Sequence, residues 1–163
     1  MPPLIRWLTA THPRLNDLAV LLLRLSVGAI LFATGAGKVF GWFGGQGLAA
    51  TIEVFVTRMG VAAPLAYLSC FTELIGGALL LVGLLTRPAA VAVAINMTVA
   101  TAMTLPLGFL ARAAFPFSLL VATVAILLTG PRAWSLDARL PGAEREKAAI
   151  PAAEEPQPTG RGR

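Results

Sequence analysis

Residues 18–37 read LAVLLLRLSVGAILFATGAG, an apolar run that is interrupted by a single charge, Arg24. A helix of about 20 residues is long enough to cross the hydrocarbon core of a bilayer. Three more apolar runs follow, at about residues 63–85, 88–107 and 114–130. The sequence therefore predicts an all-α fold, an integral membrane bundle of four spanning helices.

The composition of the chain argues against several other classes of protein. Of its 163 residues, 56% are hydrophobic and only 13% are charged, whereas soluble chains average about 25% charged residues. A soluble enzyme, a secreted disulfide scaffold and a disordered protein are therefore disfavoured. The single cysteine, Cys70, excludes an internal disulfide. With a single histidine, His12, we expect no haem held by two histidines and no metal site.

The chain divides into three predicted parts: an N-terminal segment at 1–17, a membrane domain at 18–138 and a tail at 139–163. The tail is rich in Pro, Ala, Glu and Arg without periodicity, which predicts disorder. The first apolar run also has an interpretation as a cleaved signal peptide, because residues 33–36 are small. Its length and the internal Arg24 favour an uncleaved spanning helix instead.

A short amphipathic helix is predicted in the connection between the first two spans. Its apolar residues fall on one face, with Glu53 and Arg58 elsewhere. Such a helix either lies at the membrane surface or packs over the bundle as part of an ordinary loop, and both interpretations remain open. The residues that share the apolar face are Leu48, Ile52, Phe55, Val56 and Met59.

The distribution of basic residues predicts the orientation in the membrane. Four spans place both termini on one side, and that side holds nine Lys and Arg residues. The other side holds three, namely Lys38, Arg58 and Arg112. Since basic residues concentrate in cytoplasmic segments, both termini are predicted to be cytoplasmic. The basic residues that give the net charge of +5 thus flank the spans and form no patch. We therefore expect the lipid bilayer rather than a nucleic acid as partner.

Charged residues inside predicted spans are the main candidates for a site. Arg24 and Glu73 would each cost about 2.5–3.5 kcal/mol if isolated at the centre of a span. Glu73 is expected near the middle of its span and Arg24 about 5 Å to the cytoplasmic side of the middle of its own. We therefore predict an Arg24–Glu73 ion pair. Asn96 on the third span and Lys38 above the pair complete the predicted buried polar site.

Two interpretations of this predicted site remain open. Intramembrane ionisable residues often bind a ligand or carry a proton. A buried ion pair can also serve only to fix the register of neighbouring helices. Lys38 in addition has an interpretation as an interfacial anchor, and Cys70 as a small core residue.

Five short stretches in the chain match one known family in order and spacing, over about residues 20–140. On these stretches the sequence resembles the DoxX family of small bacterial four-helix membrane proteins. The stretches are LLRLSVG at 22–28, GAGKVFG at 35–41, ELIGG at 73–77, VGLLTR at 82–87 and GPRAWSLD at 130–137.

The resemblance implies a multi-pass protein of the bacterial cytoplasmic (inner) membrane and an association with redox chemistry. One branch of the family supplies a membrane subunit of thiosulfate:quinone oxidoreductase, and others are linked to oxidative stress and to thiol or sulfur metabolism. The characteristic charged positions of the family map onto Arg24, Lys38, Glu73 and Arg87. Many relatives carry an acidic residue near the start of the last span, where this chain has none at 115–118. The closing segment also reads Gly-Pro-Arg-Ala-Trp here, where the family usually has Gly-Pro-Gly-Arg and an aromatic.

We therefore expect an accessory membrane subunit of a redox system. That system would act in quinone chemistry, in sulfur chemistry, or in thiol chemistry and the response to oxidative stress. No cofactor is expected within the chain, and quinone is the candidate ligand, because Arg24, Asn96 or Lys38 would supply a donor in an apolar cleft. Any enzymatic activity would be that of a membrane subunit of a quinone-linked oxidoreductase, with a soluble or membrane oxidoreductase as partner. A homo-oligomer is an open expectation. The alternatives are a small-solute or proton-coupled transporter, and a membrane scaffold whose Arg–Glu pair is purely structural.

Overall fold

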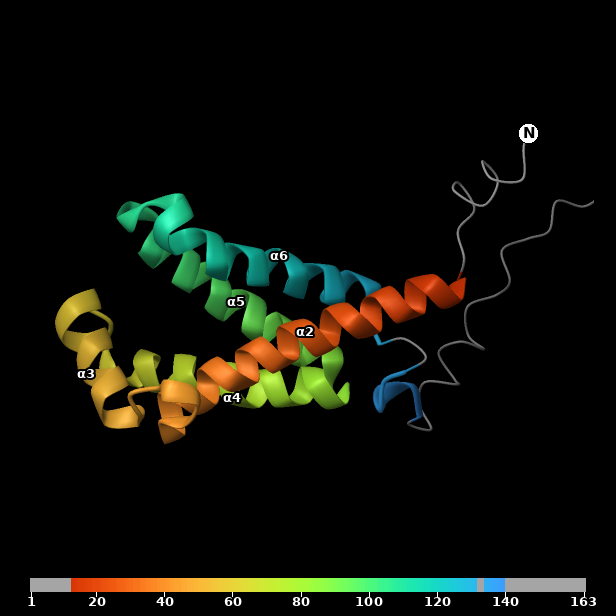
Figure 1. The fold of residues 1–163 in the computed structure, drawn as a ribbon, viewed down its shortest axis with the longest axis horizontal. Coiled ribbons are helices and arrows are strands. Elements are labelled where there is room, and N and C mark those ends of the chain that lie inside the picture. The colour runs from red at the N-terminus through yellow and green to blue at the C-terminus, as the bar shows by residue number, and fades with distance from the viewer. Residues whose placement is uncertain (1–12, 132–133, 140–163) are drawn as a thin grey trace, which may run out of the picture.

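The computed structural model describes residues 13–131 and 134–139, and every regular element in them is helical (Figure 1). Four helices in this part of the chain are long and apolar enough to cross a membrane. The predicted all-α architecture of four spans is confirmed. The helices of the bundle are α2 (Pro13–Phe40), α4 (Ala63–Val82), α5 (Thr86–Thr104) and α6 (Ala114–Thr129).

Shorter helical turns connect and follow the long helices. The 3-10 turn η1 (Trp42–Gly44) follows α2, and helix α3 (Leu48–Met59) lies between η1 and α4. Two turns, η2 (Leu105–Leu107) and η3 (Phe109–Ala113), join α5 to α6, and η4 (Asp137–Arg139) closes the described part of the chain.

Several helix ends differ from the predicted ends by a few residues, and two of these differences have a clear local cause. Helix α2 begins at Pro13 rather than at residue 18, because proline is well suited to the first turn of a helix. Helix α4 ends at Val82 rather than near residue 85, because Gly83 adopts the left-handed conformation, with φ 69°. Residues 1–12 and 140–163, which hold most of the predicted N-terminal segment and of the predicted tail, lie outside the described residues.

Helices α2 and α4 run antiparallel and approach each other closely at glycines. A Cβ atom on Gly35 would lie 2.4 Å from the backbone nitrogen of Leu74, and one on Gly77 would lie 2.4 Å from that of Phe32. Small residues allow helices in lipid to come this near. These contacts fix the register, with Gly35 opposite Leu74 and Gly28 opposite Leu81.

In this register the two antiparallel helices are offset along their axes, so that their ends are not level. Since Gly28 lies opposite Leu81, the end of α4 is level with about residue 26 of α2. The first 13 or so residues of α2, roughly 20 Å at 1.5 Å per residue, therefore extend past the end of α4 (Figure 1). The segment 134–139, here called the closing segment, folds back to this end, where the amide of Asp137 donates to the carbonyl oxygen of Gly83 at 3.0 Å.

Helix α3 packs over the bundle through part of its apolar face, while Val56 of that face is exposed. Ile52 is buried in a cluster with Ala66 and Cys70 of α4, and Leu48 and Phe55 pack against that cluster. Glu53 and Arg58 are exposed on the outer face. The predicted amphipathic helix is therefore present, and it packs over the bundle. Cys70 is a core residue, as predicted.

Candidate functional site

Lys38 and Glu73 form an ion pair that joins α2 to α4. The Nζ atom of Lys38 donates to both carboxylate oxygens of Glu73, at 2.6 Å to Oε1 and 2.7 Å to Oε2. The Glu73 side chain is only 6% exposed, whereas that of Lys38 is 30% exposed. Asn96 of α5 donates its Nδ2 to Oε1 of Glu73 at 3.5 Å. Three helices thus meet at one carboxylate, and we call Lys38, Glu73 and Asn96 the Lys38 cluster.

Helix geometry explains why Lys38 and Glu73 meet. The Cα–Cβ bonds of a helix tilt toward its N-terminus, so side chains on antiparallel neighbours can tilt toward each other. Gly35 lies against the backbone of Glu73 and Leu74, and Lys38 is one turn beyond Gly35. The side chain of Lys38 therefore points back along α2 toward Glu73, while that of Glu73 points toward Lys38.

The predicted Arg24–Glu73 pair is wrong. Arg24 donates from Nη2 to the carbonyl oxygen of Trp134 at 2.7 Å, and a Cβ atom on Gly83 would lie 2.5 Å from its Nη1. Gly83 is ten residues, or about 15 Å, along the chain from Glu73. The prediction measured each depth from the middle of its own span and assumed that the two middles coincide. The stagger between α2 and α4 breaks that assumption.

Arg24 instead belongs to a second polar cluster, at the end of the bundle where α4 stops. The Asp137 carboxylate accepts hydrogen bonds from the backbone amides of Leu85 at 2.7 Å and Thr86 at 2.8 Å. It therefore caps the start of α5, where a carboxylate is favoured by the free amides and the helix dipole. We call Arg24, Trp134 and Asp137 the Arg24 cluster.

Sequence reasoning missed the role of Asp137. The closing stretch supported the family resemblance, but its contacts join residues that are more than 50 positions apart in the chain. The sequence offered only a weak signal: the side chain of Leu85, just before α5, cannot cap a helix, so the free amides there take their acceptors from another residue or from water.

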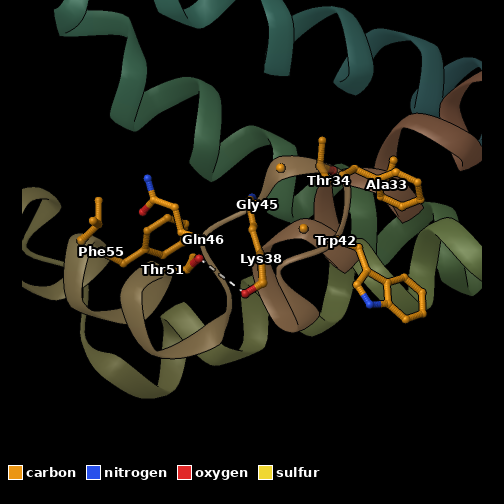
Figure 2. Close-up of a pocket in the computed structure, with 12 residues that line it drawn as sticks. Ala33, Thr34, Lys38, Trp42, Gly45, Gln46, Thr51 and Phe55 are labelled. Atoms are coloured by element: carbon orange, nitrogen blue, oxygen red, sulfur yellow. Dashed lines mark hydrogen bonds between the residues drawn. The ribbon is translucent and has the colours of Figure 1, made fainter.

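A cavity of about 520 Å³ adjoins the Lys38 cluster and is walled by the end of α2, the η1 turn and α3 (Figure 2). Among the described residues that line it, Lys38 is the only ionisable one. The lining is otherwise aromatic, aliphatic or uncharged. We call this space the Lys38 cavity. It is lined by Ala33, Thr34, Gly37, Lys38, Trp42, Phe43, Gly44, Gly45, Gln46, Thr51, Val54 and Phe55.

Lys38 lines this cavity, and its ammonium group has a hydrogen-bond donor that Glu73 does not occupy. It carries three N–H groups, and the two oxygens of Glu73 account for two of them. Its Nζ also lies 5.7 Å from the centroid of the Phe55 ring, within range of a cation–π interaction. Because Glu73 balances the charge of Lys38, the site suits an uncharged acceptor such as a carbonyl oxygen better than an anion.

Comparison with known proteins gives two matches. The family model described as DoxX matches residues 19–106, which include all three residues of the Lys38 cluster. A protein of Bacillus subtilis (strain 168) named "Putative oxidoreductase CatD" is 34% identical over 122 residues, which are 74% of this chain and 86% of that protein. No solved structure matches the chain.

Proposed function

Because the chain belongs to the DoxX family of membrane proteins, we propose that it is an accessory membrane subunit of a quinone-linked redox system. The Lys38 cavity would hold the quinone ring. One observation carries this proposal: a charge-balanced ammonium with a remaining donor lines an apolar cavity of about 520 Å³. Ligand cavities are typically apolar, enclose about 300–1,000 Å³ and contain a few convergent polar groups. The name of the Bacillus subtilis relative supports the redox assignment.

Each residue of the Lys38 cluster has a distinct role in this proposal. The free N–H of Lys38 donates to a ring carbonyl, and Glu73 holds the ammonium group in position through its two oxygens. Asn96 in turn orients Glu73 from the third helix. A bound quinone would supply two-electron, two-proton redox chemistry, with the electrons from a soluble or membrane oxidoreductase partner and the protons from the adjacent water. The residues of this chain bind and orient the ring.

The proposal includes the location of the chain and its orientation in the membrane. We place the chain in the bacterial cytoplasmic (inner) membrane with both termini in the cytoplasm, from the excess of basic residues on that side. The Lys38 cavity then lies in the outer half of the membrane. A partner that exchanges electrons directly with a quinone there would contact the outer surface, where α3 presents Glu53 and Arg58.

The test is quinone binding by the full chain in lipid nanodiscs, with Lys38→Gln compared with Arg58→Gln. Loss of a hydrogen bond from a charged donor costs about 1.5–3 kcal/mol, so Kd for Lys38→Gln should rise about tenfold or more. Arg58 is an exposed cation on the outer face of α3, and its variant should bind like the parent. The double variant Lys38→Gln/Glu73→Gln avoids an unpaired buried carboxylate, and it should fold and show the same loss. Equal affinity in all four proteins, or no binding by the parent, would overturn the proposal.

A purely structural role is the second candidate, and one observation favours it: Glu73 is paired on α2 and hydrogen-bonded to α5. In that case Lys38→Met/Glu73→Leu would fold, and it would replace the parent fully in cells that need the protein. The quinone proposal predicts a stable double variant without function.

The transport alternative differs again, since Glu73→Gln would then abolish proton-coupled uptake by proteoliposomes and leave quinone binding unchanged.

A further inference from the structure

Three neighbouring aromatic rings project from the end of α2 and from η1, at the edge of the Lys38 cavity. The ring centroids of Phe40 and Trp42 lie 5.0 Å apart, and those of Trp42 and Phe43 lie 6.5 Å apart. Trp42 is 54% exposed and Phe43 is 75% exposed, and both line the cavity. Exposed aromatic groups of this kind are typical of the membrane interface, where the rings contact lipid. We call Phe40, Trp42 and Phe43 the aromatic rim.

The backbone holds the aromatic rim in an unusual conformation. Phe43 has φ 54°, in the left-handed region that residues with a side chain rarely adopt, and Gly41 and Gly44 on either side also have positive φ. Non-glycine residues in this region tend to occur at functional sites. The turn therefore presents the Phe43 ring outward instead of folding it into the bundle.

The register of α2 and α4 gives the depth of the cavity. Since Gly35 lies opposite Leu74, Lys38 is level with about residue 71, eight residues or roughly 12 Å from the start of α4. Helix α4 has 20 residues, a length that matches the hydrocarbon core of about 30 Å. The cavity therefore extends from the interface into the acyl region, and the rim lies near the interface.

Helix α3 walls one side of the cavity. Its inner side contributes Thr51, Val54 and Phe55 to the lining, while Glu53 and Arg58 on its other side are exposed. Figure 2 shows Phe55 and Trp42 on opposite sides of Lys38. The amphipathic helix α3 thus covers one side of the cavity, and the aromatic rim borders the other.

We propose that the Lys38 cavity opens sideways into the bilayer, past the aromatic rim, and takes its ligand from the lipid phase. This inference rests on the proposed function and narrows its substrate class to quinones with a long isoprenoid tail. The ring carbonyl accepts a hydrogen bond from Lys38, and the tail leaves between Trp42 and Phe43 into the acyl chains. A cavity that opened only to water would exclude such a tail.

The first test compares two probes with the same ring, menaquinone-4 and tail-less menadione, in nanodiscs that contain the full chain. With concentrations expressed as mole fraction in the lipid, menaquinone-4 should bind at least as tightly as menadione. At a fixed, subsaturating total amount of menaquinone-4, doubling the amount of lipid should lower the fraction of protein that holds menaquinone-4 about twofold by mass action. Binding of menadione without binding of menaquinone-4 would overturn the sideways opening while the proposed function stands. Binding of neither probe would overturn the proposed function itself.

The second test locates the rim without any quinone. In the variant Trp7→Phe/Trp134→Phe, Trp42 is the remaining tryptophan of the chain. Its fluorescence should be quenched strongly by lipids brominated near the headgroup end of the acyl chain and weakly by aqueous iodide. The matched control keeps Trp134 instead of Trp42 and replaces the other two tryptophans. Quenching of Trp42 by iodide but not by brominated lipid would contradict the proposal.

Discussion

The Arg24 cluster lies at the end of the α2–α4 pair where α4 stops, about 15 Å from the Lys38 cluster, and each cluster places a cation of α2 next to an oxygen acceptor. Arg24 is 4% exposed and donates to a backbone carbonyl, and Asp137 beside it is engaged with the amides of α5. Lys38 is paired with a side-chain carboxylate, is partly exposed and lines a cavity. The first arrangement fastens the closing segment to the helices, whereas the second leaves a donor available to a ligand.

The difference shows that burial of a charge does not by itself identify a binding site. A buried cation that donates to the backbone fixes a chain segment in place, as Arg24 does with Trp134. A cation that is balanced by a carboxylate and still reaches a cavity can donate to a ligand without a large electrostatic penalty. The predictions that follow disrupt one cluster at a time, in order of decreasing expected effect.

The largest effect is expected from Lys38→Met. It leaves Glu73, with a side chain that is 6% exposed, as a buried carboxylate without its partner, a loss that typically costs about 3–5 kcal/mol. The measurement is the free energy of unfolding in mixed micelles by titration with a denaturing detergent. The double variant Lys38→Met/Glu73→Leu should recover most of the loss, and a single variant as stable as the parent would contradict the pairing.

Gly35→Val should disrupt the Lys38 cluster through the backbone. The new side chain would meet the backbone of Leu74 and Glu73, and overpacking of this kind costs about 1–3 kcal/mol or more. Ala29→Val places the same valine side chain at an exposed position of the same helix and is the matched control. The midpoint of thermal unfolding in detergent should be clearly lower for Gly35→Val than for Ala29→Val. If the two midpoints coincide, α2 and α4 do not approach at Gly35.

Asp137→Ala should weaken the Arg24 cluster by a smaller amount. The variant removes the acceptor for the amides of Leu85 and Thr86, and loss of a helix cap costs about 0.5–2 kcal/mol. Hydrogen exchange at these two amides should become faster, while exchange around Glu73 stays unchanged. Asp137→Asn retains a capping oxygen and should lie between the parent and Asp137→Ala. Faster exchange throughout the bundle would show that the two clusters are not independent.

Trp134→Ala should have the smallest effect, below about 0.5 kcal/mol in unfolding free energy, as for most exposed positions. Arg24 uses the backbone carbonyl of Trp134, which the substitution retains, and the ring is exposed. The free energy of unfolding is measured as for Lys38→Met, by titration with a denaturing detergent in mixed micelles. A loss as large as that of Lys38→Met would mean that the indole ring, rather than the backbone, holds the closing segment.

Much of the fold could be predicted from the sequence, because long apolar runs have few alternatives to spanning helices. Glu73, Lys38 and Asn96 were also identified as candidates, since charged and amide groups within spans are conspicuous. The pairing between them depends on how far one helix slides along another, which hydropathy does not encode. Gly28, Gly35 and Gly77 carried that information, because only glycine permits the observed backbone approach.

The folding-back of the closing segment was beyond the reach of pattern reasoning. Asp137 contacts the start of α5 across more than 50 residues of sequence, and a single aspartate has no periodicity that would reveal its target. Once Asp137 occupies that position, the same segment also supplies the carbonyl of Trp134 to Arg24. The assignment of Arg24 therefore required knowledge of a segment more than 100 residues away.

A pair of double-mutant cycles on unfolding free energy tests the separation of the two clusters most directly. One cycle combines Lys38→Met with Glu73→Gln, and the other combines Arg24→Gln with Glu73→Gln. The Lys38–Glu73 pair should show a coupling energy of about 1 kcal/mol or more, whereas the Arg24–Glu73 combination should be additive within about 0.5 kcal/mol. Strong coupling of Arg24 to Glu73, with additivity for Lys38, would contradict the account.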